Sequence, residues 1–319
     1  MPFLGQPQPI DHESWSVAQD LLRPMLSGQR PGPHALLALE RDLPGLASVI
    51  PFIAWRLKKT GELTELSKAV ASRMEDSLRQ QSALHLIQES GIRELFELFE
   101  REGIRALLIK GHAIGRTHYP SPLCRPTSDV DVWVDPKRVD DAEGLLRDSG
   151  YEITQRQSGR LWHAASGWSR QAGGMTFHLD LHWDISNRWY FRHRLSFEDA
   201  FTRRRLIEVD GAEVSAPGDG DALIIACVHL AAMDPDVTIE SRWLLDVYML
   251  MKSMSPSTQS SMLETCIATH TIEACAVYSG LAISLGEHPN ALQLAAALGA
   301  ASIGSRIRKY DKTLGSRFF

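Results

Sequence analysis

Acidic residues alternate with valines in the segment SDVDVWVD (residues 128–135), which otherwise has the composition of a buried strand. Side chains two positions apart on a strand lie on the same face, so Asp129, Asp131 and Trp133 share one face. The two carboxylates would lie roughly 6–7 Å apart along the strand. Two anions at this distance repel each other unless a cation lies between them or water screens them. The segment alone therefore fits a metal site and a solvent-exposed polar face equally well.

A second alternating segment, FHLDLHW (residues 177–183), supplies another carboxylate. His178, Asp180 and His182 lie on one face of this predicted strand, and the apolar side chains lie on the other. Asp180 on a neighbouring strand would complete an oxygen-rich Mg²⁺ site. An ordinary amphipathic strand is one alternative, and a transition-metal site made by the two histidines and Asp180 is another. In that last case, three successive residues on one face of a straight strand would all have to reach one ion.

A Lys-Gly pair, Lys110-Gly111, follows the apolar run IRALLI. A glycine between a strand and a helix permits close approach of the backbone, and the free N–H groups of a helix N-terminus bind anions. Lys110 would add a point charge. A strand-ending glycine beside an exposed lysine is the alternative, because the pair matches neither a Walker loop nor a dinucleotide-binding fingerprint.

These residues require a mixed α/β (α+β) unit with a small mixed sheet, between helical segments. Helical periodicity covers much of residues 1–100, and it returns after residue 219. Between them, residues 104–110, 129–134, 151–155 and 175–183 are predicted strands, and Asp210-Gly211 predicts a hairpin turn. The predicted division is a helical N-terminal region (1–100), a catalytic core (101–216) and a helical C-terminal region (217–319).

The formal net charge of −5 argues against a strongly basic surface, so nucleic acid is not an expected partner. The N-terminal sequence has neither the basic start nor the apolar run of a signal peptide, and no apolar segment is long enough to span a bilayer. The four cysteines form no CxxC pair and match no zinc pattern. A cytoplasmic protein without a membrane partner is therefore expected.

The order of these features is more specific than any one of them. A strand, a glycine turn, a helix, an Asp-x-Asp strand and a later acidic strand together resemble the nucleotidyltransferase superfamily related to DNA polymerase beta. The chain is more closely similar to a bacterial family of uncharacterised nucleotidyltransferase-like proteins. The segments that carry this resemblance are GIRALLIKGHAI (103–114), YPSPLCRPTSDVDVWVD (119–135), FHLDLHW (177–183) and RWLLDVYML (242–250).

The resemblance implies a role for each matching residue. Asp129 and Asp131 would hold Mg²⁺, with Mn²⁺ as an alternative ion. Asp180 would complete the catalytic and metal-binding acidic set, and it would orient the acceptor hydroxyl or act as its base. Lys110 and Gly111 would lie beside the triphosphate of the NTP, for which ATP is expected.

The resemblance extends to the loop before the Asp-x-Asp strand, where Arg125 matches a family arginine that would neutralise phosphate charge. The superfamily usually has Gly-Ser or Gly-Gly, whereas His112 follows the glycine here. No serine hydroxyl therefore follows the glycine directly, and His112 or Ser128 would have to replace it in nucleotide binding.

Other residues have plainer interpretations. His229, within an apolar helix, is expected to be a core or interface histidine. Asp246 follows Arg242 by four positions, which predicts a salt bridge along a helix. The triple arginine at 203–205 fits a solvated face or an anion-attracting patch. Four tryptophans near the third aspartate fit core packing or an aromatic-lined acceptor cleft, namely Trp162, Trp168, Trp183 and Trp189.

Three functions remain open at this point. The first is Mg²⁺-dependent transfer of a nucleoside monophosphate from an NTP to a hydroxyl or phosphate acceptor, which would be a small molecule, a peptide or a protein. The second is a nucleotide- or partner-binding module of the same fold with little turnover. The third is a metal-dependent hydrolase that uses the face formed by His178, Asp180 and His182.

Overall fold

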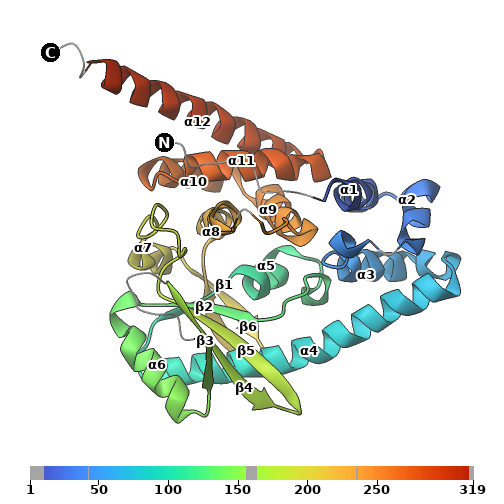
Figure 1. The fold of residues 1–319 in the computed structure, drawn as a ribbon, viewed down its shortest axis with the longest axis horizontal. Helices are drawn as coiled ribbons and strands as arrows, with labels where there is room; N and C mark the ends of the chain where they lie inside the picture. Colours follow the sequence, from blue (N-terminus) through green and yellow to red (C-terminus); the bar gives the residue numbers. More distant parts are fainter. Residues whose placement is uncertain (1–10, 42, 156–163, 235, 316–319) are drawn as a thin grey trace.

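The computed structural model describes residues 11–41, 43–155, 164–234 and 236–315, and it confirms a mixed α/β fold. Its centre is a five-stranded sheet in the order β1-β2-β5-β4-β3 (Figure 1). The strands are β1 (Ala106–Ile109), β2 (Val130–Val134), β3 (Glu152–Gln155), β4 (Ala165–Ala172) and β5 (Met175–His182).

Strand β2 lies in the interior of the sheet and is buried along its whole length. It pairs antiparallel with β1 and parallel with β5. In this register Asp131 lies opposite Ile109 on one side and opposite Asp180 on the other. The pairing therefore brings the two predicted acidic strands into direct contact.

Helices cover both faces of the sheet, which explains why β2 is buried on both sides. The three valines of β2 pack with the long helix α4 (Lys68–Arg101) and with α6 (Val139–Asp148). Trp133, on the opposite face, belongs to a core shared with α5 (Lys110–His118) and the terminal helices. The valines therefore lie on one face of β2, and Asp131 and Trp133 lie on the other, as the period of two predicts.

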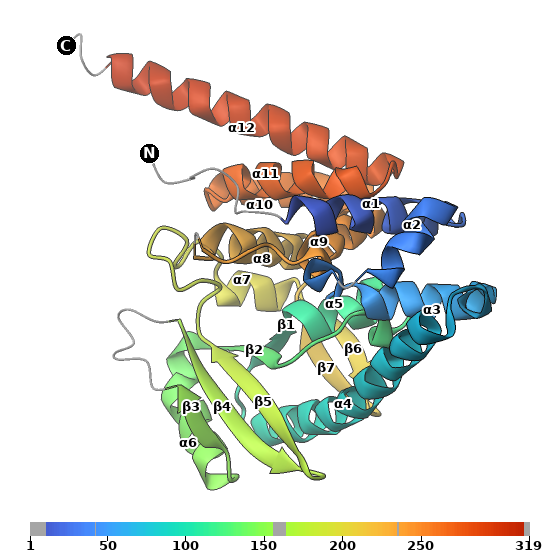
Figure 2. The ribbon, with the colours of Figure 1, turned by 45° about the vertical axis from the view of Figure 1, so that its right-hand side comes forward.

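The remaining helices form the flanking layers. The N-terminal helices are α1 (His12–Leu26), α2 (Pro33–Leu37) and α3 (Ile50–Thr60), and α7 (Phe197–Thr202) follows the sheet. The C-terminal helices are α8 (Asp219–Ala232), α9 (Ser241–Ser253), α10 (Pro256–Ala268), α11 (Ile272–Ala282) and α12 (Pro289–Gly315). Figures 1 and 2 both show α8–α12 stacked on one side of the sheet and α4 on the other. None of the described helices is long and apolar enough to cross a membrane.

Two hairpins show how local sequence sets these elements. Strands β6 (Arg205–Val209) and β7 (Ala212–Ala216) are joined by Asp210-Gly211, whose φ angles of 49° and 79° are those of the predicted turn. Gly173 and Gly174 likewise have positive φ angles and join β4 to β5. Strand β4 is not predicted from the sequence, because its residues Ala165–Ala172 include a glycine and lack a run of β-branched side chains.

Candidate active site

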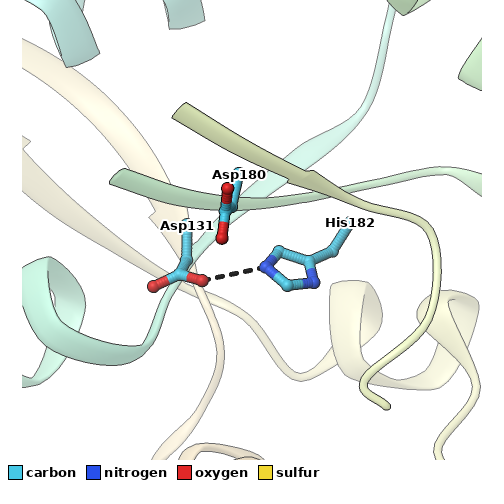
Figure 3. A group of neighbouring side chains, drawn as sticks. All are labelled: Asp131, Asp180 and His182. Atoms are coloured by element: carbon cyan, nitrogen blue, oxygen red, sulfur yellow. Dashed lines mark hydrogen bonds and ion pairs between the residues drawn. The ribbon is translucent and has the colours of Figure 1, made fainter. Parts of the chain in front are cut away.

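The carboxylate of Asp131 lies at the centre of the site, where three adjacent strands deliver polar groups. Lys110, which follows β1 directly, donates from Nζ to Asp131 Oδ1 over 2.6 Å. His182 at the end of β5 places Nε2 2.8 Å from the same oxygen (Figure 3). Asp131 is only 8% exposed, so the ammonium of Lys110 compensates a buried carboxylate.

The electrostatics of the pair follow from this contact. Burial alone would raise the pKa of Asp131, but Lys110 and His182 hold it well below its usual range. Burial alone would lower the pKa of Lys110, but Asp131, with smaller contributions from Asp180 and Asp129, raises it. Both groups are therefore charged at neutral pH.

The backbone at Lys110 is unusual. Its φ angle is +55°, in the left-handed region that residues other than glycine rarely adopt. The strain of such a conformation is of order 1–2 kcal/mol. It occurs where β1 ends and α5 begins, and the lysine that adopts it makes the central ion pair, as strained residues at functional sites often do.

Asp180 differs from Asp131 although the two lie side by side. It has no hydrogen-bond partner among the described residues, and burial together with the nearby Asp131 and Asp129 raises its pKa. A half-buried carboxylate with a raised pKa and a free lone pair is suited to accept a proton. The structure thus gives the two paired aspartates distinct environments.

One group of ligand atoms in the described part of the chain could hold a metal ion. The carboxylates of Asp131 and Asp180 and a ring nitrogen of His182 lie within 4.8 Å of one another. Asp129, a predicted metal ligand, is outside this group because β2 begins at Val130 and the alternation of the strand does not fix its side chain. It accepts a hydrogen bond from Ser128 over 3.1 Å and lines the same cleft.

The predicted grouping of His178 with Asp180 and His182 also differs from the structure. His178 is exposed near the start of β5, and Asp131 from the neighbouring strand takes its place beside the other two residues. The reason is the spacing along a strand, since residues 178 and 182 are separated by about 13 Å.

Gly111 lets the loop before β2 pack onto helix α5. A Cβ atom at this position would lie 2.5 Å from Thr127 Cγ2 and 3.2 Å from Arg125 Nη1. One turn later, a Cβ at Gly115 would lie 3.1 Å from Arg125 Cβ. The glycine pair therefore forms a flat surface for Arg125, and Gly111 also lines the cleft.

His112 points away from the cleft into a buried network. Its Nε2 lies 2.9 Å from Thr127 Oγ1, which also donates to Gln88 Oε1 over 3.2 Å. Burial lowers the pKa of His112 to about 3, and the stacked ring of His85 contributes further. His112 is accordingly a neutral residue that contacts Thr127 in the loop before β2. The prediction that it contacts nucleotide would require it to line the cleft, and it is not among the lining residues.

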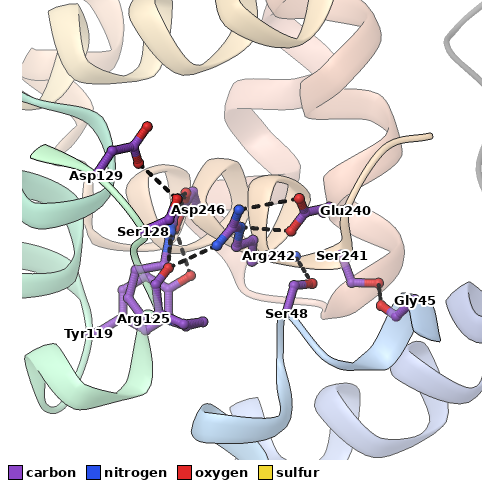
Figure 4. Close-up of polar contacts among 11 residues, drawn as sticks. Gly45, Ser48, Tyr119, Arg125, Ser128, Asp129, Glu240, Ser241, Arg242 and Asp246 are labelled. Atoms are coloured by element: carbon purple, nitrogen blue, oxygen red, sulfur yellow. Dashed lines mark hydrogen bonds and ion pairs between the residues drawn. The ribbon is translucent and has the colours of Figure 1, made fainter. Parts of the chain in front are cut away.

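Arg125 and Asp246 form a buried ion pair across 121 residues of sequence. Nε of Arg125 donates to both oxygens of Asp246 over 2.8 and 3.0 Å, and Nη2 donates to Oδ2 over 2.6 Å (Figure 4). Tyr119 donates a further hydrogen bond of 2.8 Å to Asp246. The charge of Arg125, predicted to neutralise phosphate, is therefore already matched by a carboxylate on α9.

The predicted salt bridge between Arg242 and Asp246 is wrong, because Asp246 is occupied by Arg125. Arg242 instead contacts Glu240 over 2.8 Å and donates to the carbonyl oxygen of Pro126 over 3.1 Å (Figure 4). Its guanidinium thus lies beside the loop that carries Ser128 and Asp129. The sequence did not predict that Tyr119 and Asp246 bind Arg125, or that Arg242 contacts the loop before β2.

A cleft of about 180 Å³ brings most of these residues together. The predicted residues that line it are Lys110, Gly111, Arg125, Ser128, Asp129, Asp131 and Asp180. Helices α8 and α9 contribute the opposite wall through Ala226, His229, Arg242 and Trp243. His229, which was expected to be a core or interface histidine, is therefore a cleft residue. Burial and Lys110 lower its pKa to about 3, and its ring packs edge-on against Trp243.

The remaining candidates lie elsewhere. Arg203 and Arg205 pair with Asp221 and Asp219, so the arginine run is mostly neutralised by α8. Trp168 is buried in the core, Trp189 is 79% exposed, and Trp162 lies outside the described residues. Of the tryptophans in this group, none that the structure describes lines the cleft.

Comparison with protein families identifies the chain. Residues 46–283 match the profile described as "Uncharacterised nucleotidyltransferase", and the chain belongs to this family. The match confirms the family predicted from the sequence and includes the sheet, the cleft and helices α8 and α9. A comparison with curated proteins gives no match.

Solved structures include distant neighbours of the chain. The antibiotic-resistance factor ANT(2'')-Ia is 11% identical over 62% of this chain and 96% of its own, with a TM-score of 0.42. The lincomycin-bound lincosamide antibiotic adenylyltransferase LnuA is 16% identical over 51% of this chain and 94% of its own, with a TM-score of 0.35. A nucleotidyltransferase-like antigen of Paracoccidioides brasiliensis is 16% identical over 59% and 91%, with a TM-score of 0.38.

Proposed function

We propose that the protein transfers a nucleoside monophosphate from an NTP, with ATP as the expected donor, to a hydroxyl acceptor in a Mg²⁺-dependent reaction. The observation that carries this proposal is the register of the two strands, which places Asp131 directly beside Asp180 in a cleft that also contains Lys110. Membership of the nucleotidyltransferase family supports the same reaction class.

The charges of the cleft favour a nucleotide bound together with a cation. Three cationic side chains, Lys110, Arg125 and Arg242, line the cleft together with four aspartates. The aspartates outnumber the cationic side chains, so the cleft would repel a triphosphate. A bound divalent cation would make the net charge of the cleft positive. With a volume of about 180 Å³, the cleft suits the phosphate chain better than the whole nucleotide.

The donor set fits Mg²⁺ in part. Carboxylate oxygens are the ligands that Mg²⁺ and Mn²⁺ prefer, and Asp131 and Asp180 supply them, whereas the nitrogen of His182 is a ligand more typical of Zn²⁺ or Fe²⁺. Burial, together with the nearby carboxylates of Asp131 and Asp129, raises the pKa of Asp180, and a cation would relieve the repulsion among these carboxylates. Asp131 Oδ1 is engaged by Lys110 and His182, so its second oxygen is the one available to a metal.

The reaction forms a bond between the acceptor oxygen and the α-phosphorus and breaks the bond from that phosphorus to pyrophosphate. Bound Mg²⁺ supplies electrostatic stabilisation of the charge on the transferred group. Asp180, with its free lone pair, accepts the proton of the acceptor hydroxyl. Lys110 and Arg242 attract and orient the phosphates at the edge of the cleft, where Lys110 is paired with Asp131 and Arg242 with Glu240.

The other two functions predict different behaviour. A binding module would bind nucleotide without transfer. Asp180, which has no hydrogen-bond partner among the described residues, favours proton transfer instead. A hydrolase based on His178, Asp180 and His182 lacks support, because His178 is outside the group of ligand atoms. The expected cytoplasmic location is retained in the proposal, since all four cysteines are free and buried.

The test combines binding with transfer. Calorimetry measures the affinity for ATP with and without Mg²⁺, and α-labelled ATP with a cell extract then reveals any labelled product. Asp180→Asn should reduce transfer by about 10²-fold or more while ATP still binds, and Asp131→Asn should abolish Mg²⁺-dependent transfer. Asp141→Asn on the exposed face of α6 is the matched control. Full Mg²⁺-dependent activity in the Asp131 variant would contradict the proposal.

A further inference from the structure

A second cleft, of about 300 Å³, adjoins the first one at Asp180. The two clefts share three residues, Lys110, Asp180 and His229. The other residues that line the second cleft come from β4, from the end of β5 and the segment after it, and from the end of α8. They are Ala165, Ser166, Gly167, His182, Ile185, Ser186, Asn187, Ala232 and Met233. A molecule in this cleft would reach Asp180 beside a wall that includes neither Arg125 nor Arg242, which line the first cleft.

We propose that this second cleft binds the acceptor, and that the acceptor is an uncharged small molecule that presents a hydroxyl group beside an apolar portion. The inference rests on the proposed nucleotidyl transfer, for which two substrates must meet at one carboxylate. Asp180 is that carboxylate, because it lines both clefts and has no hydrogen-bond partner among the described residues.

The charge of the second cleft excludes a phosphorylated acceptor. Among its described lining residues only Lys110 and Asp180 carry a full charge, and the Lys110 ammonium is shared between Asp131 and, in the proposed reaction, the phosphates of the nucleotide. No guanidinium lines this cleft in the described part of the chain, whereas two line the first. An anionic acceptor would therefore lose its hydration without gaining a counter-ion, which is costly.

The polar and apolar groups of the cleft match the proposed acceptor. Asn187 uses its side-chain oxygen to accept from the backbone N–H of Ala164 over 2.5 Å, and its amide nitrogen has no partner in the described structure. That nitrogen can donate to a neutral oxygen of the acceptor. Ile185, Ala232 and Met233 provide the apolar part of the wall. Such a mixture of few polar groups with apolar walls is typical of small-molecule sites.

His229 is the residue that would orient the acceptor hydroxyl. It lines both clefts from α8, and its ring nitrogens have no hydrogen-bond partner among the described residues. Its ring rests edge-on against Trp243 at 5.5 Å between centroids, which limits its motion. A neutral imidazole in this place can hydrogen-bond the hydroxyl, while the proton itself passes to Asp180.

The class of acceptor is tested by fractionation. A small-molecule extract is separated by ion exchange into anionic, cationic and uncharged pools, and each pool is incubated with the full chain, Mg²⁺ and α-labelled ATP. We expect labelled product from the uncharged pool. Product only from the anionic or cationic pool would overturn the inference, as would transfer to protein or nucleic acid in the macromolecular fraction. It would also be overturned if ATP bound but no pool were labelled.

The place of the acceptor is tested by a matched pair of substitutions on α8. Ala232 lines the second cleft and Ala226 lines the first, and both are half-buried. Ala232→Phe should raise the KM for the active uncharged pool by about 10-fold or more, with the Kd for ATP unchanged. Ala226→Phe should instead weaken ATP binding. If Ala232→Phe weakened ATP binding as much as it raised the KM for the acceptor pool, the second cleft would not be the acceptor site. If the unaltered protein did not bind ATP at all, the proposed nucleotidyl transfer itself would be contradicted.

Discussion

At the residue scale, the ammonium of Lys110 lies where the site most needs positive charge. It is 2.6 Å from Asp131 Oδ1, and the coulombic attraction of Asp180 and Asp129 also acts on it. A divalent cation bound by Asp131 and Asp180 would compete with this internal counter-ion for the same carboxylate. Metal binding is therefore expected to weaken the contact between Lys110 and Asp131 and to free the ammonium for the phosphates.

Replacement of Lys110 by methionine tests this competition. The change leaves a buried carboxylate without its cation, so the free energy of unfolding should fall by about 3 kcal/mol in the absence of metal. Added Mn²⁺ or Mg²⁺ should then raise the melting temperature more in the variant than in the unaltered protein. Lys137→Met, at an exposed lysine, serves as the control. Equal stabilisation of Lys110→Met and the unaltered protein by metal would show that lysine and metal do not compete.

His112 makes stability depend on pH. Its pKa is about 3 in the folded protein and near the ordinary 6.5 in the unfolded chain, because burial disfavours the charged ring. Between these values the unfolded state binds a proton that the folded state does not, so the free energy of unfolding decreases as the pH falls. The slope is at most about 1.4 kcal/mol per pH unit for one histidine.

His112→Gln should therefore flatten this dependence. Denaturant unfolding is measured at several values between about pH 6 and pH 4, and the variant should show a slope shallower by up to one proton. His34→Gln, at an exposed histidine of α2, should leave the slope unchanged. Parallel curves for His112→Gln and the unaltered protein would mean that His112 is not buried in its neutral form.

At the element scale, helix α5 and the loop that follows it set the shape of the first cleft. The loop carries Arg125, Thr127 and Ser128 to the edge of the sheet, and it rests on the glycines of α5. Gly111→Ala places a Cβ atom 2.5 Å from Thr127, so the loop must shift. We expect a loss of about 1–3 kcal/mol in stability and a weaker affinity for ATP, measured by thermal unfolding and calorimetry.

Gly144→Ala provides the matched control for this substitution. Gly144 also lies within a helix, α6, but a Cβ atom there would meet nothing within 4 Å. This variant should gain up to about 1 kcal/mol from the better helix propensity of alanine, without any change in ATP affinity. If both substitutions had the same effect, the packing between Gly111 and the loop would not matter.

The sequence predicted most strands of the sheet and the side-chain faces of β2 and β5, but it did not predict how the strands pair. The alternation of SDVDVWVD and FHLDLHW was enough to place Asp131 and Asp180 on polar faces, and Asp210-Gly211 was enough to place a hairpin. The register that pairs the two aspartates depends on parallel pairing between segments about 50 residues apart, which no local pattern specifies. Strand β4 was missed, although the Gly-Gly pair before β5 is itself a hairpin signal.

At the scale of the whole molecule, the site is assembled from distant segments. The sheet supplies the carboxylates, helix α8 lines both clefts, and helix α9 lines the first one. The sequence indicated the aspartates because a strand has a period of two. It did not indicate that Arg125 would pair with Asp246, since two partners separated by 121 residues are brought together only by the packing of α9 against α5 and its loop. The same packing made His229 a cleft residue.

The Arg125–Asp246 pair is therefore expected to hold the C-terminal helices against the sheet. Both side chains are about 5–6% exposed, so Arg125→Met leaves a buried carboxylate unpaired and should cost about 3–5 kcal/mol. Arg242→Met removes a guanidinium from the same cleft, but its partner Glu240 is 39% exposed, so about 1 kcal/mol or less should be lost.

Hydrogen exchange distinguishes the structural role of Arg125 from the proposed binding role of Arg242. In Arg125→Met the amides of α9 and of the loop at residues 119–128 should exchange faster, because the contact that joins them is lost. In Arg242→Met these amides should remain protected while the affinity for ATP decreases, because that guanidinium is proposed to attract the phosphates. If the two variants lost equal stability and showed equal exchange in α9, the buried pair would not be the contact that joins the C-terminal helices to the catalytic sheet.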